Sequence, residues 1–116
     1  MILIIGAEAS GKREFAKGLG YAEKDFADAA LDEKRVVYNV QDIVFDDPDR
    51  VEALYNELIK KDVVICNEVG SGIIPVDRKT RLGREAAGRL CVLLAKKADA
   101  VVRMVCGIPN IIKGEL

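Results

Sequence analysis

Short apolar runs alternate along the chain with longer segments in which apolar residues recur at helical spacing. A short continuous apolar run is typical of a strand that is buried on both faces of a sheet. Such runs predict strands at Ile2–Ile5, Val36–Val40, Asp62–Cys66 and Ala100–Val105. The tail, residues 107–116, predicts either a short edge strand or a segment that docks on the sheet.

Three of the intervening segments predict helices. They span Lys12–Leu19, the stretch from Pro48 to Lys60, and Asp77–Lys97. In the last of these, the residues expected to face the core are Leu82, Ala86, Leu90, Leu93 and Leu94. Residues 21–34 predict a short helix and a loop, and residues 67–76 predict a loop that contains Gly and Pro. The alternation of strands and helices predicts an α/β sandwich, a mostly parallel sheet with helices on both faces, as a single domain over residues 1–116.

Composition and charge exclude several classes of protein. The net charge is −1 with the two signs interspersed, so the chain lacks the basic tract of a general nucleic-acid binder. No apolar run is long enough to span a bilayer, and the first residues lack the basic flank of a secretory signal. Cys66, Cys91 and Cys106 fit reduced core cysteines. These features predict a cytoplasmic protein without a nucleic-acid or membrane partner.

The first predicted strand leads directly into the pattern G-x-x-x-x-G-K and then into a helix. The residues are Gly6, Ala7, Glu8, Ala9, Ser10, Gly11 and Lys12. In this context the backbone N–H groups of such a loop converge on one concavity, and the helix N-terminus adds partial positive charge. The pattern therefore predicts a phosphate-binding loop that binds ATP or GTP, with Lys12 at the terminal phosphates. It also predicts that the fold is a P-loop nucleotide-binding sandwich. The alternative is a glycine-containing turn with an exposed lysine.

Position 13 departs from the pattern, which expects a Ser or Thr hydroxyl to hold Mg²⁺ beside the phosphates. Arg13 cannot ligate a cation, and it either covers phosphate charge or points to solvent. Glu8 places a carboxylate in a loop meant for anions, where it faces outward or holds Arg13. Both residues argue against catalysis more than against binding, and they make an Mg²⁺ requirement doubtful.

A second cluster of candidate residues follows the strand at 62–66. Carboxyl ends of parallel strands share one edge of the sheet, so Glu68 should converge with the phosphate loop. A carboxylate there can hold Mg²⁺ or act on the attacking hydroxyl, and the alternative is a solvated loop acid. We therefore take Lys12 and Glu68 as candidate catalytic residues, with Glu68 also as a candidate metal ligand.

Arginines recur at the start of the predicted long helix, and Arg78 and Arg81 are candidates for binding the nucleotide phosphates. The alternative, that they pair with Asp77 and Glu85 on a solvated face, is equally open. Arg84 continues the same spacing.

The run Asn67-Glu68-Val69-Gly70-x-Gly72-Ile73-x-Pro75 and the arginines that follow it resemble the adenosylcobinamide kinase / adenosylcobinamide-phosphate guanylyltransferase family of cobalamin biosynthesis. The phosphate loop and Gly107-Ile108-Pro109 are similar to that family as well. The resemblance implies a nucleotide-binding fold, often trimeric, that phosphorylates the aminopropanol arm of a corrinoid. It also implies transfer of GMP from GTP through a guanylylated histidine.

The chain departs from that family in several places. It contains no histidine, so the guanylylated-histidine route is impossible in it. Asn39 stands where the family's middle strand carries an acid, and the segment before that strand is shorter than usual. Two hypotheses remain open: a kinase that acts on a cobinamide-like alcohol, and a degenerate nucleotide-binding or partner-binding module without turnover.

Overall fold

The computed structural model describes residues 1–68 and 77–116. Within these residues, six strands form one sheet in the order β2-β3-β4-β1-β5-β6. The strands are β1 (Ile2–Gly6), β2 (Phe26–Asp28), β3 (Val36–Tyr38), β4 (Val63–Asn67), β5 (Ala100–Val105) and β6 (Ile108–Lys113). Neighbouring strands are parallel except for β5 and β6, which form an antiparallel hairpin. The alternative of an edge strand for the tail is therefore confirmed.

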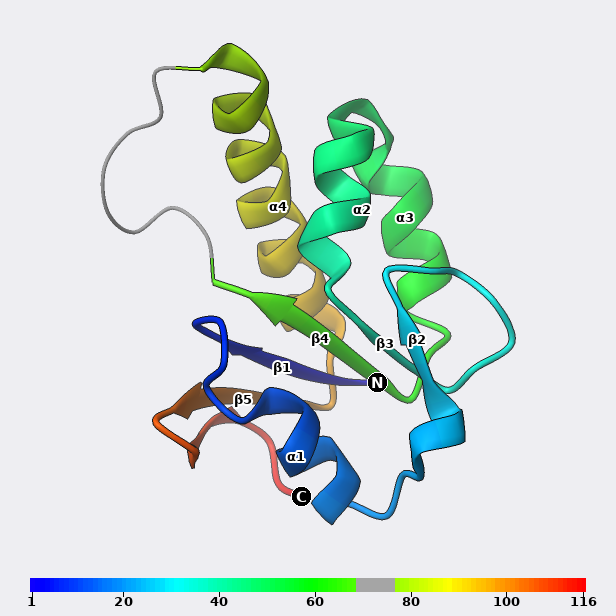
Figure 1. Ribbon diagram of the computed structural model, residues 1–116, viewed down its shortest axis with the longest axis vertical. Helices are drawn as coiled ribbons and strands as arrows, with labels where there is room; N and C mark the ends of the chain where they lie inside the picture. Colours follow the sequence, from blue (N-terminus) through cyan, green and yellow to red (C-terminus); the bar gives the residue numbers. More distant parts are fainter. Residues whose placement is uncertain (69–76) are drawn as a thin grey trace.

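Helices cover both faces of the sheet, as predicted (Figure 1). They are α1 (Lys12–Gly18), α2 (Val40–Asp46), α3 (Val51–Leu58) and α4 (Arg78–Lys97), with the short 3₁₀ segments η1 (Glu23–Asp25) and η2 (Pro48–Arg50). α1 lies on one face, whereas α2, α3 and α4 lie on the other (Figure 1). No helix in the described part of the chain is long and apolar enough to cross a bilayer.

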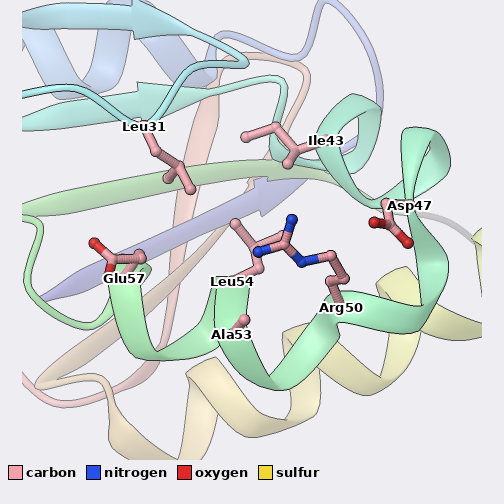
Figure 2. Close-up of a pocket in the computed structure, with 7 residues that line it drawn as sticks. All are labelled: Leu31, Ile43, Asp47, Arg50, Ala53, Leu54 and Glu57. Carbon is pink, nitrogen blue, oxygen red and sulfur yellow. The ribbon is translucent and has the colours of Figure 1, made fainter.

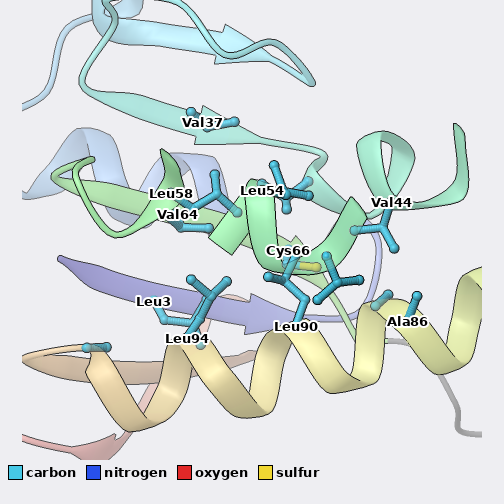
Figure 3. Close-up of a cluster of buried hydrophobic side chains, with 14 of the residues drawn as sticks. Leu3, Val37, Val44, Leu54, Leu58, Val64, Cys66, Ala86, Leu90 and Leu94 are labelled. Atoms are coloured by element: carbon cyan, nitrogen blue, oxygen red, sulfur yellow. The ribbon is translucent and has the colours of Figure 1, made fainter. Parts of the chain in front are cut away.

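The core is split into two clusters by the central strands. Leu3 packs with the side chains of α2, α3 and α4, among them Leu54 and Leu90 (Figure 3). Its neighbour Ile4 packs with Ala16 of α1 in the second cluster. Successive side chains of a strand point to opposite faces, so a strand covered on both faces needs an unbroken apolar run. The prediction of a doubly buried β1 is confirmed.

Two elements were not predicted. Residues 26–28 form β2 instead of helix or loop, and Phe26 and Ala27 are buried against the sheet. The predicted strand at 36–40 ends at Tyr38, because Asn39 takes a left-handed conformation with φ of 55° and starts α2. Three-residue strands and a seven-residue helix are too short to show a clear period.

Two burial predictions were wrong. Leu82 was expected to face the core, but it is 43% exposed. The next residue, Gly83, is buried against α2, where an added Cβ would lie only 2.2 Å from the ring of Phe45. Cys106 was expected in the core, but it is exposed in the turn between β5 and β6. Cys66 is buried, and a hydrogen bond with Cys91 together with burial raises its pKa well above the usual value.

Candidate functional site

The loop between β1 and α1 follows the carboxyl end of a central strand, since β1 runs between β4 and β5. Space and backbone conformation explain the two glycines of this loop. A Cβ on Gly6 would lie 2.7 Å from the carbonyl oxygen of Met104, and Gly11 caps α1 with φ of 93°. Side chains are disfavoured at both positions, because the first lacks space and the second has a left-handed backbone. Gly6 and Gly11 therefore have a structural reason to be glycine in this loop.

Lys12 is buried beneath the loop, with 8% of its surface exposed. Its ammonium group donates to the carbonyl oxygen of Ala7 at 2.5 Å and to Ser10 Oγ at 3.4 Å. Burial lowers the pKa of Lys12, and the nearby carboxylates of Glu8 and Glu68 oppose that effect. Lys12 is therefore not the exposed lysine that the alternative interpretation expected, and phosphate binding by the loop stays a prediction.

A hollow of about 440 Å³ opens beside the loop. Residues 8–14 form one side, Tyr38 and Asn39 at the end of β3 form another, and Ile65 and Asn67 of β4 contribute as well. Arg13 is exposed, and its guanidinium stacks over the ring of Tyr38 at 4.8 Å from the ring centroid. The sequence did not single out Tyr38, because an aromatic residue at the end of an apolar run also fits the core.

Glu68 does converge with the phosphate loop, since its backbone N–H donates to the Gly6 carbonyl oxygen at 2.8 Å. Its carboxylate is held by Arg103 of β5, at 2.5 Å from Nε to Oε1 and 3.1 Å from Nη2 to Oε2. The pair raises the pKa of Arg103. Arg103 was not predicted as a site residue, although it is a lone arginine in the apolar run at 100–105.

A chain of hydrogen bonds joins the carboxyl ends of β2, β3 and β4. Gln41, 6% exposed, accepts from the Asn67 N–H at 3.0 Å and donates to Asn39 Oδ1 at 3.4 Å. Asn39 in turn donates to Asp28 Oδ1 at 2.8 Å. The neutral side chain at position 39 is thus hydrogen-bonded to a carboxylate on the neighbouring strand. Neither Gln41 nor Asp28 was predicted, because only the sheet order brings them together.

The predicted residues Arg78 and Arg81 lie away from the hollow beside the phosphate loop. Arg78 lines a second hollow of about 450 Å³, together with Lys79 and Arg89 of α4 and with Asp49. Arg81 is exposed on the same helix and lines neither hollow. Asp77 accepts from the N–H and hydroxyl of Thr80, capping α4. A role for Arg78 and Arg81 at the nucleotide phosphates stays a prediction.

A third hollow, of about 250 Å³, lies over α2 and α3 (Figure 2). Leu31 and Leu54 form apolar walls, the Arg50 side chain extends toward Leu54, and Asp47 and Glu57 lie at opposite sides (Figure 2). None of the predicted site residues lines this third hollow.

The side chains at the loop do not fit a resident Mg²⁺. Arg13 replaces the hydroxyl, Asn39 is neutral, and both oxygens of Glu68 are bonded to Arg103. Across residues 1–68 and 77–116, no three His, Cys, Asp or Glu side chains come together as a possible metal site. The positive charge that faces a phosphate here would come from Lys12 and Arg13.

Comparisons with known proteins agree with one another. The family model described as cobinamide kinase / cobinamide phosphate guanyltransferase matches residues 27–112. The bifunctional adenosylcobalamin biosynthesis protein CobU of Salmonella typhimurium is 48% identical over 48 residues, 41% of this chain and 26% of that protein. The corresponding protein CobP of Pseudomonas aeruginosa is 32% identical over 80 residues, 63% of this chain and 46% of that protein. The chain therefore spans less than half the length of these relatives.

Proposed function

Since this chain belongs to the cobinamide kinase / cobinamide phosphate guanyltransferase family, we propose that it binds ATP or GTP at residues 6–13 and retains only the kinase half of the chemistry. The observation that carries the proposal is the placement of Lys12. It lies inside a loop between strand and helix, with its ammonium on loop oxygens, beside a hollow of about 440 Å³.

Each residue has a proposed task. Lys12 exchanges the Ala7 carbonyl for phosphate oxygens and stabilises charge on the transferred phosphoryl group. Arg13, placed on Tyr38, faces the same phosphates. Once Glu68 is released from Arg103, its carboxylate acts as a general base for the acceptor hydroxyl of a cobinamide-like alcohol. A metal role for Glu68 is a separate hypothesis, and it also requires the pair with Arg103 to open.

The guanylyl transfer of the family is not part of the proposal. That step, through a guanylylated histidine, needs an imidazole, and the chain contains none. The pairing of Glu68 with Arg103 favours a second candidate function, a nucleotide-binding or partner-binding module without turnover. Both candidates predict nucleotide binding, and they differ in whether a phosphorylated product appears.

Calorimetry with ATP and GTP, with and without Mg²⁺, tests the binding. We expect Lys12→Ala to weaken it by roughly 10- to 100-fold, the contribution of one or two charge-assisted hydrogen bonds. Lys24→Ala, which removes an exposed lysine, is the matched control. No binding of either nucleotide at millimolar concentration would overturn both candidates. Nucleotide binding without phosphorylation of adenosylcobinamide would overturn the kinase and support only the second candidate, the module without turnover.

We also propose self-association, with the trimer implied by the family as the expected state. Strand β6 is exposed along its whole length, and Ile108, Ile111 and Ile112 are 68%, 50% and 56% exposed. Apolar groups in such number on an edge strand favour a contact with another chain. Light scattering after gel filtration gives the mass, and a monomer at all concentrations would refute this part.

A further inference from the structure

The turn between β5 and β6 consists of two residues, Cys106 and Gly107. Both have positive φ, 50° and 77°, as a type I′ hairpin turn requires. Val105 and Ile108 pair across it, so the turn ends a regular hairpin. Cys106 is exposed, and a Cβ added to Gly107 would meet nothing within 4 Å. The turn therefore requires positive φ at both residues, whereas a side chain at Gly107 would have free space.

This turn contacts the phosphate loop through the backbone of Gly107. The Gly107 N–H donates to the Ser10 carbonyl oxygen at 2.9 Å. A Cβ on Gly11 would lie 3.2 Å from Gly107 Cα and 3.7 Å from the terminal carbon of Met104. The loop thus rests on the hairpin, and Figure 1 shows the two at the same end of the sheet.

The bond to Ser10 also orients its neighbour. In a planar trans peptide the C=O and the following N–H point in opposite directions. With the Ser10 carbonyl directed at the turn, the Gly11 N–H points away from the turn, and β3 and β4 end on the other side of β1 from β5. The hollow lies on that side, with Tyr38 and Asn67 in its walls. A backbone N–H aimed into such a hollow is a phosphate donor.

We propose that Gly107 is a positioning residue for the phosphate loop: its N–H fixes the Ser10 carbonyl and thereby aims the Gly11 N–H at bound phosphate. The affinity readout of this proposal rests on the proposed nucleotide binding, whereas its structural readout does not. The opposing view is that the turn only connects two strands. In that case the turn can change without any effect on the loop.

The test compares two substitutions at one position. Gly107→Asn keeps the N–H and tolerates positive φ, whereas Gly107→Val keeps the N–H but strongly disfavours that backbone. Neither side chain meets an obstacle at its Cβ, so the comparison isolates the turn conformation. For ATP and GTP measured by calorimetry, we expect Gly107→Val to bind roughly fivefold more weakly, the effect of one ordinary hydrogen bond, and Gly107→Asn to bind like the wild type.

Backbone NMR provides the readout that needs no nucleotide. Gly107→Val should shift the amide resonances of residues 7–12, and Gly107→Asn should leave them in place. In the unmodified protein, the Gly107 amide should exchange slowly with solvent. Free exchange of that amide, or a folded Gly107→Val with unchanged loop resonances, overturns the proposal, and the exchange result applies even where Gly107→Val does not fold. Absence of nucleotide binding by the wild type would refute the proposed function but would leave the structural readout of Gly107 unaffected.

Discussion

Gly83 and Gly88 lie on the same helix, α4, but a methyl group added to each has opposite consequences. At Gly88 an added Cβ meets nothing within 4 Å, so Gly88→Ala gains only helix propensity, about 1 kcal/mol. At Gly83 it would lie 2.2 Å from Cδ1 of Phe45, whereas ordinary contact begins at 3.4 Å. The ring of Phe45, on α2, must therefore retreat by about 1.2 Å, the difference between these two distances.

The two variants share the propensity gain, so the difference between their stabilities isolates the packing cost between α2 and α4. Overpacking costs about 1–3 kcal/mol. We expect Gly83→Ala to unfold with a free energy lower than that of Gly88→Ala by this amount. For a domain of this size, the two midpoints of thermal unfolding should differ by roughly 4–12 °C.

Urea unfolding followed by circular dichroism measures both free energies under identical conditions. A further variant sharpens the assignment: in a Phe45→Ala background, Gly83→Ala should become as favourable as Gly88→Ala, because the obstructing ring is gone. Equal stabilities of the two single alanine variants would refute the packing of α2 on α4 through Gly83.

Three further predictions concern the site. Gln41→Leu should lower the free energy of unfolding by about 1–3 kcal/mol, because the Asn67 N–H loses its acceptor; unchanged urea unfolding would contradict this. Phosphate stabilises the charged form of Lys12, so affinity should fall as pH rises through its pKa, which burial holds below 10.5. Calorimetry in two buffers should show proton uptake on binding in that alkaline range, and no uptake would count against the lysine–phosphate contact. A double-mutant cycle on Glu68 and Arg103 should give only a weak coupling, since Arg103 is 49% exposed and solvent screens the pair; a coupling as strong as that of a buried ion pair would contradict this.

Much of the fold was accessible from the sequence because it depends on local pattern. Apolar runs at 2–5, 62–66 and 100–105 report strands buried on both faces, and these strands form the centre of the sheet. Where the segments are short, as in β2 and α2, the period is not visible. Leu82 shows the same limit in a long helix: Phe45 of α2 packs against the neighbouring Gly83, so Leu82 is left exposed.

The sequence by itself determined the phosphate-loop pattern, the absence of histidine and the arginine after the loop, since each is a matter of residue type and spacing. Only the tertiary structure decided which groups meet that loop. It buried Lys12, stacked Arg13 on Tyr38, and brought Arg103 to Glu68 across β1. It also brought the turn at 106–107 under the loop. Apart from the burial of Lys12, these contacts join residues that are far apart in the chain and that the strand order brings together, so no local periodicity records them.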